Sequence, residues 1–361
     1  MDKYIQSRRK DFNAIKQALS SDIKSQNINS LVIEGDSLAV LKRIPSESIS
    51  LVLTDPPYHS TKKKNIKGDT SFNEDIDFLN WMGEYVTEWK RVLKKNGAIF
   101  CYCSATMSSR LEVVFRKEFN VLSNIVWTKP NEPGFDGWKQ KMKKESLRQW
   151  YEHTERIIFA EPSFEGNIFK SWYGLYLKEK RKQAGLSGHQ LTELTGAYGK
   201  VNHGGAVSNW EAGRNVPSKE QYEKICAAIL DSGKVTSMLP YEDLIRPFNV
   251  NGQIEFTDVW NFPTVRPYSG KHPAEKPISM LVHAIEATTY EDDIVLDCFA
   301  GSGSTQIAAL KTKRKCISIE LDSVWAERIS SITMEKIQKE TKEEVKKIKK
   351  EEKLQMALAY K

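Results

Sequence analysis

The tetrapeptide Asp55-Pro56-Pro57-Tyr58 directly follows the apolar run Leu51-Val52-Leu53 and has the residue types of a catalytic site. Two prolines alone would indicate a stiff turn, because proline fixes φ and lacks an N–H donor. A turn gives no reason for the acid at the end of the run or for the tyrosine. As chemistry, Asp55 and the Pro56 carbonyl are two adjacent acceptors that would polarise the N–H bonds of an aromatic amino group. The Tyr58 ring offers a flat face for a base taken out of its stack.

A glycine loop follows a second apolar run near the end of the chain. The segment Asp297-Cys298-Phe299-Ala300-Gly301-Ser302-Gly303 comes directly after Ile294–Leu296. Gly-x-Gly alone fits a dinucleotide turn, a phosphate loop or a plain tight turn. Position 306 is Gln where a dinucleotide fingerprint has its third glycine, and the loop lacks the P-loop lysine. The next apolar run ends at Glu320, and an acid there suits ribose hydroxyls, so the two segments favour an adenosyl ligand.

A third segment, His272-Pro273-x-x-Lys276-Pro277, precedes a predicted helix over Ile278–Ala287. Taken alone, it fits a proline-capped helix start as well as it fits a functional site.

These segments need a scaffold, and seven short apolar runs predict one. Runs of this kind, closed by polar or Gly/Pro residues, indicate buried strands, and the stretches between them have helical spacing, as in Ile76–Leu93. The alternation predicts an α/β fold with a mostly parallel, seven-stranded sheet and helices on both faces. Asp36, Asp55 and Asp297 fall at the carboxyl ends of strands, where such sheets bind ligands. The predicted strands are Leu31–Glu34, Ser50–Thr54, Ala98–Cys103, Leu122–Thr128, Arg156–Ala160, Ile294–Asp297 and Cys316–Glu320.

The pattern changes in the middle of the chain, which predicts an insertion. Residues 168–245 show helices and turns without a convincing strand, and strand-like sequence resumes at Ile254–Phe256. We therefore divide the chain into an N-terminal extension (1–27), two parts of one α/β domain (28–167 and 246–330), an inserted helical domain (168–245) and a charged helical tail (331–361).

Composition narrows the class of protein. The chain has 361 residues and a net charge of +7, which is compatible with a polyanionic partner without proving one. The absence of an apolar run of about 18 residues and of a signal peptide predicts a cytoplasmic protein with no membrane partner. The five cysteines form no Cys-x-x-Cys pair and the histidines lack metal-ligand spacing, so we expect neither a disulfide framework nor a metal site.

Together and in this order, the segments resemble the beta group of amino-methyltransferases of DNA, of the restriction-modification type. The resemblance covers roughly residues 28–165 and 250–330 and implies a Rossmann-like methyltransferase fold with S-adenosylmethionine as cofactor. It implies that Asp55, Pro56 and Tyr58 hold the target base. Its implied cofactor contacts are Asp36, Lys276, Asp297, Phe299, Gly301, Gly303 and Glu320.

Residues 172–231 resemble the helix-turn-helix domain of phage-repressor and Cro-type regulators. The resemblance rests on Lys-Gln-Ala-Gly-Leu-Ser, Val-Ser-Asn-Trp-Glu-x-Gly and Val-Pro-Ser, which end at Ser187, Gly213 and Ser218. The turn before Ala206 is longer than in that family, which leaves individual base contacts open. The alternative is a helical protein-interaction module. The candidate DNA contacts are His203, Ser208 and Asn209 in this domain and Lys62, Lys63 and Lys64 after the catalytic tetrapeptide.

The expected activity is direct, in-line methyl transfer to the N6 amino group of adenine in double-stranded DNA, after base flipping. Adenine is preferred because the tetrapeptide begins with Asp, whereas cytosine-N4 members of this family more often begin with Ser. Methylation of cytosine N4 is the alternative, and an inert helix-turn-helix regulator is the alternative of another class. A homodimer and a companion restriction nuclease remain open as partners, and the expected setting is a bacterial or phage-encoded protein in the nucleoid.

Overall fold

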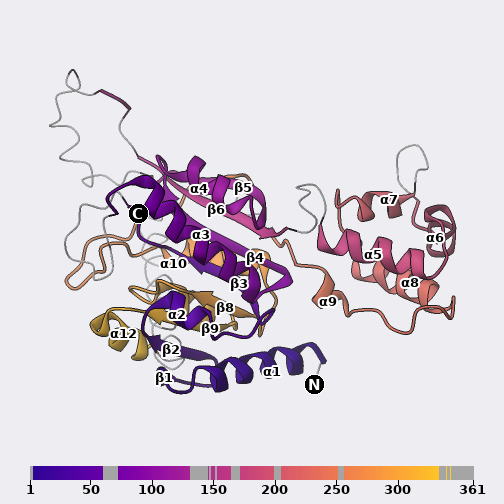
Figure 1. Cartoon of the computed structure of the whole chain (residues 1–361), viewed down its shortest axis with the longest axis horizontal. Coiled ribbons are helices and arrows are strands. Elements are labelled where there is room, and N and C mark those ends of the chain that lie inside the picture. The colour runs from indigo at the N-terminus through magenta and orange to yellow at the C-terminus, as the bar shows by residue number, and fades with distance from the viewer. Residues whose placement is uncertain are drawn as a thin grey trace, which may run out of the picture.

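The described residues of the computed structural model form a nine-stranded mixed sheet in the order β1-β2-β9-β8-β3-β4-β6-β5-β7 (Figure 1). They comprise residues 3–59, 72–130, 145, 148–150, 153–163, 171–198, 205–250, 256–332, 339 and 342. The strands are β1 (Ile23–Gln26), β2 (Ser30–Glu34), β3 (Ile49–Thr54), β4 (Leu93–Ser104), β5 (Phe119–Trp127), β6 (Glu155–Pro162), β7 (Val259–Trp260), β8 (Ile294–Asp297) and β9 (Lys315–Glu320).

All seven strands expected from apolar runs are present, but the expected number of strands was too low. The two additional strands, β1 and β7, lie at opposite edges of the sheet, where a strand needs no continuous apolar run. Of the strand expected at Ile254–Phe256, residues 254 and 255 lie outside the described residues, and Phe256 is not in a strand. The five neighbours β2, β9, β8, β3 and β4 are parallel, whereas β1 and β6 pair antiparallel with their neighbours, so the sheet is mixed.

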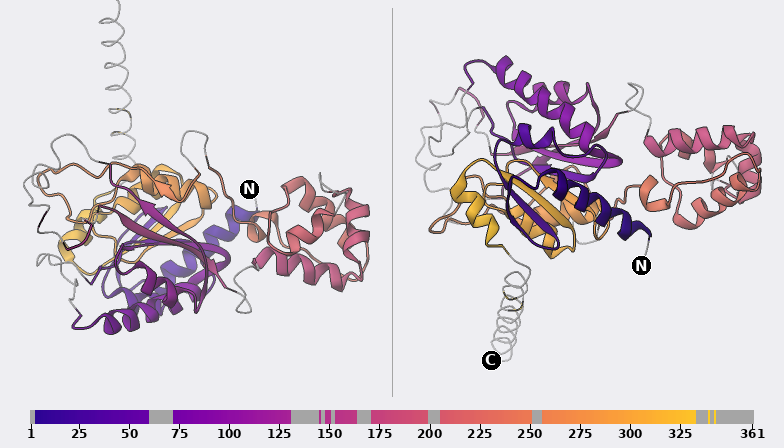
Figure 2. Two further views of the ribbon diagram at one scale, coloured as in Figure 1. Left: turned by 90° about the horizontal axis from the view of Figure 1, so that it is seen from above. Right: turned by 60° about the horizontal axis from the view of Figure 1, so that its bottom comes forward.

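Helices cover both faces of the sheet, as the left view of Figure 2 shows. Strand residues alternate between two cores: Val52 of β3 packs into one, and Leu51 and Leu53 pack into the other. The first core is closed by α1 (Lys3–Ala18), α2 (Ser37–Leu41), α3 (Asp75–Val92) and α4 (Ser108–Phe115). The second is closed by α10 (Ile278–Thr288) and α11 (Ser304–Lys311), and α12 (Ser323–Ser330) packs beside β2 and β9.

The N-terminal helix α1 packs into the first core and is held there by a buried ion pair. Phe12 and Ile15 belong to that core. The Arg8 guanidinium, 1% exposed, donates to Asp293 at 2.8 Å and to Asp243 at 3.0 Å. Asp293 precedes β8 and Asp243 lies in the helical part of the chain, so one side chain ties three parts of the molecule together.

Residues 171–245 form a group of helices with a core of their own, to the right of the sheet in Figure 1. Ser187 with Gln190 and Ser218 with Gln221 form capping boxes at the starts of two of these helices. Trp210 is 2% exposed and packs in the core of this group. The helices are α5 (Trp172–Gln183), α6 (Gly188–Thr195), α7 (Ala206–Glu211), α8 (Lys219–Leu230) and α9 (Tyr241–Leu244).

Among the helices of the described ranges, none has both the length and the apolarity that crossing a bilayer requires. Beyond residue 332 the structure describes only residues 339 and 342, so the expected charged helical tail lies almost wholly outside the described residues.

Candidate active site

A cavity of about 440 Å³ lies at the carboxyl ends of β2, β3, β8 and β9 and brings the predicted motifs together. The tetrapeptide and the glycine loop meet here because each follows a parallel strand, and the carboxyl ends of neighbouring parallel strands lie at the same edge of a sheet. The predicted residues that line the cavity are Asp36, Asp55, Pro56, Tyr58, Lys276, Asp297, Phe299, Gly301 and Glu320. Gly303 is not among the lining residues: it caps α11 with φ of +79°, and a Cβ there would lie 2.6 Å from Ile332.

Thr54 connects the two loops that carry the chemistry. It is the last residue of β3, 1% exposed, and its hydroxyl donates to Asp297 Oδ1 at 3.0 Å. The same hydroxyl oxygen accepts from the Cys298 amide at 3.2 Å. These two bonds fix the glycine loop after β8 relative to the tetrapeptide that begins at Asp55.

The glycine loop is shaped by its backbone. Gly301 has φ of +46°, and a Cβ built on it would lie 3.0 Å from the His272 ring, so a side chain there is opposed by both strain and crowding. The Gly301 amide donates to Glu320 Oε2 at 2.7 Å, and the Asp322 amide donates to Glu320 Oε1 at 2.8 Å. Burial raises the pKa of the Glu320 carboxyl. Asp36, at the end of β2, accepts from the Ala39 amide at 2.9 Å and caps α2.

Asp297 is the most buried acid of the cavity, with an exposed fraction of 4%. Burial raises its pKa to about 6, although hydrogen bonds from Thr305, the Phe299 amide and Thr54 favour the charged form and limit the rise. His272, whose ring packs against Gly301 of the same loop, has its pKa lowered to about 4, chiefly by burial, and is therefore neutral near pH 7. The carboxylate thus meets the cavity without a protonated imidazole beside it.

One wall of the cavity is aromatic, and two of its residues, Trp81 and Tyr85, were not among the predicted site residues. Trp81 and Tyr85, one helical turn apart on α3, pack against each other with ring centroids 4.8 Å apart. The ring centroid of Phe299 lies 5.2 Å from that of Tyr85, so this residue of the glycine loop extends the aromatic wall. The Tyr85 hydroxyl lies 3.0 Å from the Ser37 hydroxyl. The sequence signal was the apolar spacing of α3, which predicts core packing as readily as a cofactor wall.

The catalytic tetrapeptide forms a compact ionic cluster with two residues from other elements. The Tyr58 hydroxyl donates to Asp55 Oδ1 at 2.7 Å, and Lys276 Nζ donates to Asp55 Oδ2 at 2.5 Å. Glu155, the first residue of β6, lies 2.9 Å from the Tyr58 hydroxyl and 3.3 Å from Lys276 Nζ. Its other carboxylate oxygen contacts Lys129. Lys276 was expected among the cofactor contacts, and in this structure its ammonium donates to the Asp55 carboxylate.

The pKa values of the two carboxyl groups in this cluster, Asp55 and Glu155, are shifted in opposite directions. Burial raises the pKa of Asp55, although the attraction of Lys276 opposes the rise. Burial also acts to raise the pKa of Glu155, but Lys276 and Lys129 outweigh it and lower the value. For Lys276, burial alone would lower the pKa, and the two carboxylates raise it instead. The cluster therefore has one carboxyl of raised basicity and one that stays charged, an arrangement typical of acid–base sites.

The predicted DNA contacts lie away from this cavity or outside the described residues. Ser208 on α7 is exposed, and its hydroxyl donates to the Gly205 carbonyl at 3.1 Å. Asn209 is half-buried and accepts from Arg214 at 3.1 Å. His203, Lys62, Lys63 and Lys64 lie outside the described residues.

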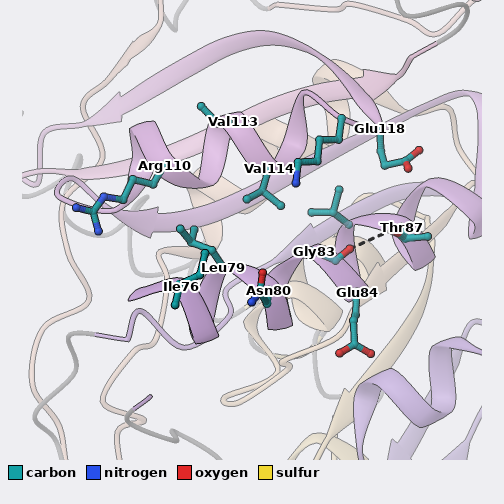
Figure 3. Close-up of a pocket in the computed structure, with 12 residues that line it drawn as sticks. Ile76, Leu79, Asn80, Gly83, Glu84, Thr87, Arg110, Val113, Val114 and Glu118 are labelled. Atoms are coloured by element: carbon teal, nitrogen blue, oxygen red, sulfur yellow. Dashed lines mark hydrogen bonds between the residues drawn. The ribbon is translucent and has the colours of Figure 1, made fainter. Parts of the chain in front are cut away.

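A larger hollow of about 610 Å³ between α3 and α4 lacks comparable chemistry (Figure 3). Its lining includes Ile76, Leu79 and Val113, and its polar groups Arg110 and Glu118 lie near opposite ends in Figure 3. None of the predicted site residues lines it. The candidate active site is therefore the smaller cavity at the strand ends.

A nine-stranded mixed sheet with the tetrapeptide and glycine loop in one cavity defines a methyltransferase of the Rossmann-like kind. Residues 49–331 match the family model of N6/N4 DNA methylases, and the chain belongs to this family. Membership in this family confirms S-adenosylmethionine as the cofactor expected from the sequence.

Relatives extend the match over most of the chain. It is 55% identical over 292 residues to YubD of Escherichia coli (strain K12), covering 80% of this chain and 83% of the relative. It is 28% identical to the DNA adenine methyltransferase YhdJ of the same organism, covering 81% and 78%. The solved PvuII DNA methyltransferase, described as cytosine-N4-specific, is 16% identical with a TM-score of 0.49, covering 86% of this chain and 90% of that one.

Proposed function

We propose that this protein is a site-specific DNA methyltransferase that transfers a methyl group to the N6 amino group of adenine in double-stranded DNA. The observation that carries the proposal is the shared cavity: Asp55 and Tyr58 face the same space as Asp297 and Gly301. A donor bound at the glycine loop and a base held at the tetrapeptide would therefore meet inside one enclosure.

The cavity residues fit S-adenosylmethionine. Gly301 leaves room that a side chain would fill, Asp297 offers a carboxylate to an α-ammonium group, and Trp81 and Phe299 offer flat apolar faces. Glu320 and Asp36 at the ends of β9 and β2 suit the ribose hydroxyls and the adenine, respectively. When bound, the cofactor supplies a methyl group on a sulfonium.

The tetrapeptide acts on the acceptor. Asp55 and the Pro56 carbonyl accept from the two amino hydrogens of the base, which leaves the nitrogen lone pair more available for in-line attack. Tyr58 stacks on the flipped base, and Asp55 accepts the proton that the methylated nitrogen releases. No enzyme nucleophile is required. Cys298 lines the cavity, but burial raises the pKa of its thiol far above the range in which it would react.

Adenine is preferred over cytosine because the tetrapeptide begins with Asp55. The family includes enzymes for both amino groups, so the base is tested by the experiment below rather than by the fold.

We propose that the helices of residues 171–245 select the DNA site as a helix-turn-helix. Two features support this: α6 and α7 contact each other, and Ser208 on α7 is exposed. Lys180 and Lys182 lie in the last turn of the preceding helix α5, and positive charge there suits a DNA backbone. A recognition helix reads bases with the residues at its start. Lys62, Lys63, Lys64 and His203 remain candidates for further contacts.

The partner is thus double-stranded DNA in the bacterial cytoplasm, and a homodimer or a companion nuclease remains open. Long-read sequencing of DNA from a methylation-free host that expresses the chain tests the proposal, with Asp55→Ala as control. A modified adenine motif that is absent from the control supports it. Modified cytosine would assign the N4 reaction, and unmodified DNA in both samples would contradict the proposed function.

A further inference from the structure

The Asp55 carboxylate already accepts from two strong donors in this structure. Both oxygens of Asp55 are engaged, Oδ1 by the Tyr58 hydroxyl at 2.7 Å and Oδ2 by Lys276 Nζ at 2.5 Å. The side chains of Lys276 and Asp55 are 8% and 17% exposed, so water competes little for them. The proposed reaction therefore starts from a site in which its main acceptor already holds two donors.

An ammonium on Asp55 opposes the chemistry in two ways. An ammonium is a charged donor and binds a carboxylate more strongly than the neutral amino group of a base does. Its positive charge also lies beside a nitrogen that becomes positive as it accepts the methyl group, where like charges repel in a buried site. Asp55 serves the target amino group better when Lys276 is held by another acceptor, because the competing ammonium is then removed.

Glu155 has the position of that acceptor. Its Oε2 lies 3.3 Å from Lys276 Nζ and 2.9 Å from the Tyr58 hydroxyl, so it faces the same two donors as Asp55. Lys129 contacts its other oxygen and anchors the carboxylate from the opposite side. The backbone of Glu155 is fixed, because β6 pairs there with Ser104 of β4 and Trp127 of β5.

Aromatic rings allow the ammonium to move between the two carboxylates. Lys276 Nζ lies 5.4 Å from the ring centroid of Tyr58, 5.0 Å from that of Tyr102 and 5.9 Å from that of Trp127. Ring faces attract a cation without directional hydrogen bonds, so they support it in either position.

We propose that Glu155 is a positioning residue that takes the Lys276 ammonium and the Tyr58 hydroxyl from Asp55 when the target base enters. The exchange removes the two competing donors from Asp55, so that its oxygens accept fully from the amino hydrogens, and it keeps the ammonium neutralised. This inference rests on the proposed function, because it concerns the acceptor step of that reaction.

A double-mutant cycle tests the exchange with the full-length protein, using DNA that carries the site found by sequencing. Glu155→Gln keeps the shape of the side chain but removes the charge that attracts Lys276, so the ammonium stays on Asp55. We expect a single-turnover methylation rate about 100-fold below wild type, comparable to the effect of removing one preorganised catalytic group. Cofactor affinity, measured by calorimetry, should change less than about twofold, because Glu155 acts on the residues that hold the target base and not on the cofactor.

The second change removes the ammonium itself. Glu155→Gln/Lys276→Met should transfer methyl groups about tenfold faster than Glu155→Gln alone, because Asp55 is then released. Glu161→Gln is the matched control: Glu161 lies on the same strand β6 and pairs with Arg246 at 2.8 Å, away from the cavity. It should retain the wild-type rate.

The outcomes separate the inference from the function on which it rests. If the double variant is no faster than Glu155→Gln, or Glu155→Gln keeps the wild-type rate, Glu155 does not release Asp55 and the inference is wrong. The same holds if melting temperatures show that Glu155→Gln is largely unfolded and Lys276→Met does not restore the rate. An inactive wild-type protein would refute the proposed function, and this inference with it.

Discussion

The pKa of Asp297 predicts how cofactor binding depends on pH. Burial raises this pKa to about 6. In the proposed function the ionised carboxylate binds the α-ammonium of S-adenosylmethionine. Protonation of Asp297 therefore competes with binding, and affinity falls as the pH drops through 6. At pH 5 about one free protein in eleven has the charged form, so the dissociation constant should be about tenfold larger than at pH 7. His272, with a pKa of about 4, stays neutral throughout this interval.

Calorimetric titration at pH 5 and pH 7 measures this effect, with Asp297→Asn as the matched variant. Both the Thr54 hydroxyl and the Phe299 amide donate to Oδ1 of Asp297, so an asparagine oxygen can accept the same two bonds. The variant should bind more weakly at pH 7 and lose most of the dependence on pH. A wild-type affinity that does not change between the two pH values would refute the assignment of Asp297 to the α-ammonium.

Three substitutions test other parts of the structure. Gly301→Val should abolish cofactor binding in calorimetry, because a Cβ there lies 3.0 Å from the neighbouring ring, whereas Gly233→Val, at a left-handed glycine with open space, should bind normally. Arg8→Ala should lower the free energy of unfolding by about 3 kcal/mol in denaturant titration, because it leaves buried acids without their cation; an unchanged stability would contradict that role. Changing Ser208 and Asn209 to Ala should relax the methylated motif by about 1–3 kcal/mol of discrimination for each base that the helix then fails to read. An unchanged motif in sequencing would move recognition elsewhere.

The sequence predicted most of the scaffold because buried strands and amphipathic helices leave periodic signals. Central strands such as β3 and β8 are buried throughout and mostly apolar, and they were found within a few residues of their observed bounds. The edge strands were missed for the converse reason: β1 is Ile-Lys-Ser-Gln with alternating half-buried and exposed residues, and β7 has only two residues. Such edges are defined by pairing with a neighbour, which composition does not show.

Site residues were predicted where they belong to a motif that follows a strand. They were missed where only the tertiary fold places them at the cavity. Asp55 and Gly301 stand in recognisable segments, whereas Glu155 is one acid among 47 acidic residues. It reaches the cavity because β6 runs antiparallel to β4, so the start of β6 lies at the carboxyl end of its neighbour. Its spacing along the chain gave no signal for this, and Trp81 was similarly hidden within the spacing of α3.

Methyl transfer by the purified protein tests the central claim most directly. Unmethylated double-stranded DNA would be incubated with S-adenosylmethionine, digested to nucleosides and analysed by mass spectrometry, with Asp55→Ala as the matched control. We predict N6-methyladenine from the wild-type protein and none from the control, although the control should still bind the cofactor in calorimetry. Equal N6-methyladenine from both proteins would contradict the role of Asp55, and DNA without methylated amino groups from the wild-type protein would contradict the proposed function.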